Sequence, residues 1–231
     1  MKQDAPTDSG NILIYILGAI FLMGLLVVVA RGAGAPGSGI DRENLIIRVT
    51  EVQKYGAELE EAVRYVLRNG YSEVDIRFAH PNAPSTYGLI TDVPARQVFD
   101  PQGGAAEYRD PPDGIQTTLT QWHFSGSNRV GDVGSDSASA RSADLVAILQ
   151  NVTRDFCVAV NDKSNVVNPA GDPPQDSGSA DVSTVFTGTF AATQQIEDAG
   201  GELSEHHEGC FEGGGTPAAG TYHYYRVLLA R

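Results

Sequence analysis

The two cysteines, Cys157 and Cys210, are the residues of this sequence whose chemistry is easiest to predict. Two thiols are the minimum for one disulfide, and exported proteins generally oxidise such a pair. We therefore predict a Cys157–Cys210 disulfide, provided that the domain carrying them lies outside the cytoplasm. The alternative is a pair of buried, unpaired thiols, so the compartment of the chain decides the chemistry.

Two polar stretches carry metal-ligand side chains. The first, just before Cys210, consists of Glu205, His206, His207 and Glu208. Adjacent side chains point to different sides of a helix or a strand, so neighbouring histidines chelate one ion poorly. The second, within residues 161–181, offers calcium the oxygens of Asp162, Asp172, Asp176 and Asp181. Their spacing matches no EF-hand. We predict solvated polar loops at both places, with no metal and no cofactor.

The other candidates for catalysis show no arrangement that indicates a reaction. A catalytic site needs a nucleophile, a base and a group that orients the base. The five histidines are dispersed along the chain, and no G-x-S-x-G elbow, H-E-x-x-H or C-x-x-C motif is present. We predict that the protein is not an enzyme and has no small-molecule substrate. Its net charge of −13 argues against nucleic acid as a partner.

An apolar segment near the N-terminus decides the compartment. Residues 12–30 contain no charged residue and no proline, asparagine or glutamine. As a helix they would be about 28 Å long, close to the thickness of the hydrocarbon core of a bilayer. We predict a transmembrane helix over residues 11–31, with residues 12–30 in contact with the lipid. Residues 1–10 would form a leader or cytoplasmic tail, and residues 32–39 a glycine-rich joint.

A cleaved secretory signal is the alternative for this segment. Lys2 supplies a positive charge, and residues 33–35 form an A-x-A pattern. However, the apolar run exceeds the usual length of about 7–15 residues, and Pro36 directly after the pattern should hinder cleavage. We therefore predict a retained anchor. Positive-inside counting does not settle the orientation. The cysteine pair and the polar remainder favour export of a domain over residues 40–231.

Three residues immediately before and at the start of the apolar run carry a family resemblance: Ser9, Gly10 and Asn11. A short polar leader ending in glycine, an apolar helix, an amphipathic helix and a β-rich domain together resemble the type IV pilins and pseudopilins. The resemblance implies bacterial origin and cleavage by a prepilin peptidase between Gly10 and Asn11. Tyr15 stands where the family usually has glutamate, as in some minor pseudopilins, so the resemblance points to a tip or accessory subunit.

The resemblance implies a non-catalytic, membrane-anchored subunit of a pilin-like or secretion-type filament. Such a chain would cross the bacterial inner membrane once and place its large domain in the periplasm or outside the cell. Its partners would be other pilin-like subunits, packed through the N-terminal helices. The alternative is a single-span envelope protein whose exported domain binds a ligand or partner.

The exported part reads as an α+β domain in which a long amphipathic helix packs on an antiparallel β-sheet. Asp41 is a plausible N-cap and Gly70 a plausible stop for that helix. Apolar or small residues recur on one face of it, at Leu45, Val49, Val52, Gly56, Leu59, Val63 and Val66. We expect this stripe to pack on the sheet of its own domain, and the sharper expectation is that the helix also contacts neighbouring subunits.

Further elements follow from periodicity and composition. Alternation predicts a half-buried strand over residues 72–78, and short strands are expected near 87–90, 97–99, 106–108 and 121–124. Residues 142–160 show helical spacing, with Cys157 beside the apolar face. Residues 161–181 should be an exposed loop, and residues 182–190 and 222–229 should be strands. A Cys157–Cys210 bridge would then tie the predicted helix to the segment leading into the last strand.

Overall fold

The computed structural model describes residues 16–23, 38–82, 84–134, 143–191 and 194–231. The chain divides into two units, Met1–Asn44 and Leu45–Arg231. Residues 16–23 are helical, whereas most of the predicted transmembrane segment lies outside the described residues. Within the described ranges, no helix is both long enough and apolar enough to cross a membrane.

Helix α2 (Ser38–Arg68) is the longest element of the described chain. It begins three residues before Asp41, so the predicted N-cap is wrong, and it ends just before Gly70, which has a φ of 89°. The predicted apolar stripe is confirmed from Val49 to Val66, where the stripe residues are buried. The helix forms because its apolar residues recur every three or four positions and face one side.

Within the part of the chain that the structure describes, five strands form one mixed sheet in the order β3-β1-β2-β5-β4. Their bounds are β1 (His123–Val130), β2 (Asp144–Val152), β3 (Gln194–Ile196), β4 (Glu208–Glu212) and β5 (Tyr222–Leu229). Three of the four pairings are antiparallel, and β3 runs parallel to β1. The predicted α+β class is confirmed, but the prediction of a wholly antiparallel sheet is wrong at β3.

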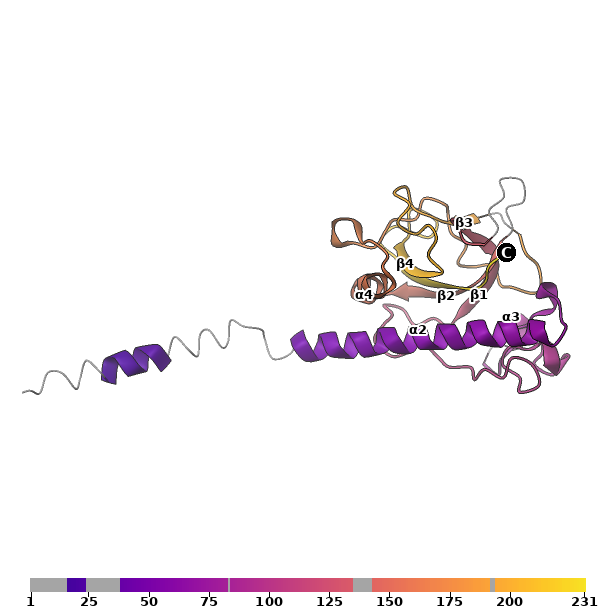
Figure 1. The fold of residues 1–231 in the computed structure, drawn as a ribbon, viewed down its shortest axis with the longest axis horizontal. Coiled ribbons are helices and arrows are strands. Elements are labelled where there is room, and N and C mark those ends of the chain that lie inside the picture. Colours follow the sequence, from indigo (N-terminus) through magenta and orange to yellow (C-terminus); the bar gives the residue numbers. More distant parts are fainter. Residues whose placement is uncertain (1–15, 24–37, 83, 135–142, 192–193) are drawn as a thin grey trace, which may run out of the picture. The chain divides into compact units, whose positions relative to one another are not determined.

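Both faces of the sheet are buried, as the central strand shows. Leu145, Ala147 and Leu149 belong to the larger core, which also contains the α2 stripe. Val146 and Ile148 alternate with them and belong to a second core on the other face. Figure 1 shows α2 along one face and the loops of the C-terminal half along the other. The sheet therefore presents no free face over its described length.

The predicted helix over 142–160 is wrong in its first half. Residues 144–152 form the central strand β2, and α4 (Arg154–Ser164) follows it. Asn151, with a φ of 54°, lies where the pairing of β2 with β5 shifts register between Leu149 and Val152. Thr153 caps α4 by accepting a hydrogen bond from the N–H of Phe156. A strand buried on both faces is apolar throughout, so its residues also satisfy helical spacing.

Several predicted strands are absent from the described residues. Residues 72–78 contain the 3₁₀ turn η1 (Glu73–Asp75), and the strand there is replaced by a single bridge between Arg77 and Gln97. The predicted strand over residues 182–190 is also irregular. Helix α3 (Pro84–Tyr87) and η2 (Pro94–Arg96) occupy part of the predicted meander. In the first of these segments Ile76 and Phe78 are buried but Val74 is 50% exposed, so the alternation seen in the sequence does not correspond to one buried face.

Two predicted strands in the second half of the chain are confirmed. The C-terminal strand spans residues 222–229 as predicted. The strand expected near residues 121–124 starts at His123, and Trp122 and Phe124 are buried core residues. The exposed loop predicted over residues 161–181 is confirmed only in part. Residues 161–164 belong to α4, and residues 165–181 form a loop with one short turn, η3 (Pro169–Gly171), in which Val166, Asp176 and Ala180 are buried.

Candidate functional site

The first turns of α2 carry apolar side chains that the domain leaves uncovered. Among residues 41–48 none is buried, and Ile46 and Ile47 are 49% and 62% exposed. From Val49 onward the stripe is covered by the sheet and loops. The two adjacent isoleucines form a small exposed apolar surface on these turns of the helix.

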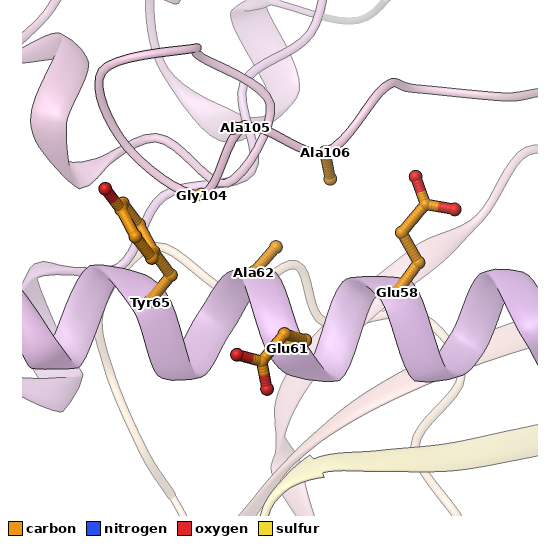
Figure 2. Close-up of a pocket in the computed structure, with 7 residues that line it drawn as sticks. All are labelled: Glu58, Glu61, Ala62, Tyr65, Gly104, Ala105 and Ala106. Atoms are coloured by element: carbon orange, nitrogen blue, oxygen red, sulfur yellow. The ribbon is translucent and has the colours of Figure 1, made fainter.

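An open pocket of about 270 Å³ lies further along α2, between the helix and a loop over residues 104–106. Figure 2 shows Glu58, Ala62 and Tyr65 pointing from the helix towards Gly104 and its neighbours. A Cβ at Gly104 would lie 2.9 Å from the Cβ of Ala62. Small residues on both sides therefore let the loop approach the helix and form the floor of the pocket.

The carboxylates at the rim of this pocket are paired within the chain. Glu58 accepts from Arg109 at 3.1 Å, and Glu61 pairs with Arg68. The guanidinium of Arg109 also lies 5.3 Å from the ring centroid of Tyr55. The rim therefore carries both charges, and its two carboxylates are already paired with arginines rather than available to bind a cation.

A second, smaller pocket of about 20 Å³ lies beside Tyr55 and Trp122. Their rings meet edge to face with centroids 5.4 Å apart. The Tyr55 hydroxyl accepts from the backbone N–H of Arg109 at 3.1 Å, and burial raises the pKa of Tyr55. A space of this volume holds about one water molecule. The pocket lies between α2 and the stretch over residues 109–112, and it is too small to hold a substrate.

Arg226 of β5 joins α2 to the sheet through two carboxylates. Its guanidinium donates to Glu60 of α2 and to Glu208 of β4, each at 2.8 Å. The Tyr224 hydroxyl donates to the other oxygen of Glu208 at 2.8 Å. Burial lowers the pKa of Arg226, but hydrogen bonding to Glu60 and the charge of Glu208 raise it above its usual value. The helix is therefore held to the sheet by a cation that pairs with two carboxylates, while its Nε has no hydrogen-bond partner among the described residues.

The structure brings Cys157 of α4 and Cys210 of β4 to disulfide-bonding distance, with Cα atoms 5.2 Å apart. Asn161, one turn further along α4, donates to the Cys210 carbonyl at 3.0 Å and accepts from its N–H at 2.8 Å. The Asn161 amide thus occupies the place of a neighbouring strand at this point of β4. The cysteine pair and the amide together align α4 with the sheet.

The structure describes some of the other residues singled out from the sequence. Gly10 and Asn11 lie outside the described residues. Among the described residues, no group of three or more histidines, cysteines or acidic residues is arranged to hold a metal. Asp176 instead accepts backbone N–H groups of its own loop, and Asp172 pairs with Arg154.

Sequence reasoning missed the residues that hold α2 in place, above all Arg226 and Tyr55. Arg226 interrupts an otherwise aromatic and aliphatic strand, and a charge at such a position is the one signal that indicates a buried partner. Its partner Glu60 lies 166 residues away, so no local pattern could identify it.

Comparison of the chain with protein-family models, with curated proteins and with solved structures finds no match.

Proposed function

We propose that the chain is a non-catalytic, membrane-anchored subunit of a pilin-like or secretion-type filament in the bacterial envelope. The apolar run over residues 12–30 and the leader glycine Gly10 support the anchor and its processing. The observation that carries the proposal is the uncovered pair Ile46 and Ile47 at the start of α2. A helix that buries one stripe on its own sheet and exposes isoleucines before it is suited to contact a neighbouring copy.

The export of the domain is part of this proposal. Residues 40–231 would lie in the periplasm or outside the cell, anchored by a single span in the inner membrane. The cysteine pair at bonding distance supports an oxidising compartment, because such pairs stay reduced in the cytoplasm.

A second candidate is a single-span envelope protein that binds a partner through its exported domain. The pocket between α2 and residues 104–106 favours it, because apolar floor residues are combined there with polar side chains at the rim. This candidate requires no contact between copies through Ile46 and Ile47.

The double variant Ile46→Asp with Ile47→Asp tests the contact between copies. In cells expressing tagged and untagged full-length chain, cross-linking between copies should fall about tenfold or more. Burying one isoleucine in the contact between copies contributes roughly 1.5–3 kcal/mol to the free energy of association. A loss of about 1.4 kcal/mol weakens the association constant about tenfold. The unfolding midpoint should stay unchanged, since both side chains are exposed within the chain.

Leu89→Asp is the matched control, because Leu89 is 64% exposed and lies away from α2 in the sequence. It should leave cross-linking at the wild-type level. Equal cross-linking in the double variant and the wild type would reject the contact between copies and favour the single-span candidate.

A further inference from the structure

His80 is buried in a cage of aromatic rings. Its ring stacks on that of Tyr108 with centroids 3.8 Å apart and planes inclined by 6°. The rings of Tyr87 and Phe99 lie 6.1 and 6.0 Å away. Neither imidazole nitrogen has a hydrogen-bond partner among the described residues. A buried polar group without a hydrogen-bond partner lowers the stability of the fold, so an imidazole in this position is unusual.

The rings around His80 belong mainly to one irregular stretch, residues 87–112, here called the cover segment. Val98, Phe99 and Ala106 place it in the core shared with α2. Few backbone hydrogen bonds hold it to other elements: the Val98 N–H donates to Arg77, and the Arg77 N–H donates to Arg96. Side chains add polar ties: the Tyr87 hydroxyl accepts from the Phe124 N–H at 2.9 Å, and Arg109 bonds to Tyr55 and Glu58 of α2. Aromatic packing supplies the rest, and within it the His80–Tyr108 stack joins the segment to the chain before it.

The charged and titratable groups around His80 are few. Within the cover segment they are Tyr87, Tyr108 and Asp110. The α2 side contributes Tyr55, which hydrogen-bonds to Arg109, and Glu58, which is paired with that same arginine. The sheet side contributes Phe124, which does not titrate and packs against Tyr87 and Phe99.

Protonation of His80 would place a cation among these rings. Burial lowers the pKa of His80, and the carboxylate of Asp110 raises it by a smaller amount. No carboxylate hydrogen-bonds to the imidazole among the described residues. The closed arrangement therefore favours the neutral ring, whereas an imidazole exposed to water has an ordinary pKa of about 6.5.

We propose that His80 is an acid-sensitive latch: the neutral imidazole holds the cover segment closed over α2, and its protonation releases the segment. Acid favours the open form, because His80 binds a proton more readily in the open form than in the closed one. The segment is therefore fully closed above the ordinary histidine pKa of about 6.5. It opens progressively as the pH falls from there towards the lowered pKa that His80 has in the closed form. Release would uncover the part of α2 that includes Ala62, and with it the pocket wall of Figure 2.

Hydrogen exchange in full-length protein in detergent micelles tests the latch. After correction for intrinsic exchange rates, the opening constant of residues 87–112 should rise about tenfold per pH unit below about 6.5. In His80→Phe, which keeps a stacking ring and removes the titration, the opening constant should not change with pH. His223→Phe is the matched control: burial lowers the pKa of His223 to about 4, and this residue lies in β5. That variant should retain the wild-type pH dependence in residues 87–112.

Equal pH dependence in His80→Phe and wild type would overturn the proposal. If His80→Phe fails to fold, an NMR titration of the His80 ring in the wild-type chain decides the question. The latch predicts that the ring protonates together with the loss of protection in residues 87–112. A ring that protonates while the segment stays protected would also overturn it.

Discussion

Reduction of the Cys157–Cys210 pair is expected to lower the free energy of unfolding by about 4 kcal/mol. The two cysteines are 53 residues apart, and a cross-link that closes a loop of this length removes that much entropy from the unfolded chain in the loop-closure model. The native geometry needs little change, because the Cα atoms already lie 5.2 Å apart. Urea unfolding of the full-length chain in micelles, with and without reductant, measures the difference.

The variant that carries both Cys157→Ser and Cys210→Ser is the control. It should unfold at the lower stability of the reduced wild type, and reductant should not change its midpoint. The Asn161 side chain still bonds to the backbone of residue 210 in this variant, so α4 should remain on the sheet. A wild-type midpoint that does not respond to reductant, with complete reduction shown by thiol counting, would contradict the predicted bridge.

Arg226→Ala is expected to lower the free energy of unfolding by about 3 kcal/mol. Removing one member of a buried ion pair leaves the other charges desolvated and unpaired, at a cost of roughly 3–5 kcal/mol when burial is complete. The Arg226 side chain is 16% exposed, so the expected loss lies at the lower end. Both Glu60 on α2 and Glu208 on β4 lose this buried cation. Glu60 then keeps only the exposed Arg64, and Glu208 keeps only the hydroxyl of Tyr224. The same denaturant titration at neutral pH measures the loss.

Arg64→Ala provides a matched comparison, since Arg64 also pairs with Glu60 but its side chain is 59% exposed. Exposed pairs of this kind contribute about 0–1 kcal/mol, so its loss should be hardly measurable. Similar destabilisation by the two alanine variants would show that burial of Arg226 is not what makes its pairs important.

The sequence predicted the elements whose pattern has a single interpretation. The α2 stripe fits only a helix with one buried face, and the aromatic and branched residues over 222–229 fit only a strand. Residues 144–152 were misassigned because the central strand is apolar on both faces, and such a run satisfies helical spacing as well. The parallel neighbour β3 has only three residues, too few for any periodicity to appear.

Among the functional features, some could be predicted from the sequence and others could not. The cysteine pairing was predictable because two cysteines allow one bridge. The contacts of Arg226 and the stack of His80 on Tyr108 were not, because they join residues brought together only by tertiary packing. The uncovered isoleucines of α2 also appear only when the structure shows which turns the domain leaves exposed.

The intact mass of the full-length chain extracted from the membrane fraction is the most direct test of the filament-subunit proposal. A prepilin-type subunit is cut once in its leader, so the account predicts a membrane-bound product whose first residue is Asn11. A membrane-bound product that retains Met1, or a freely soluble one that begins at Pro36, would contradict it.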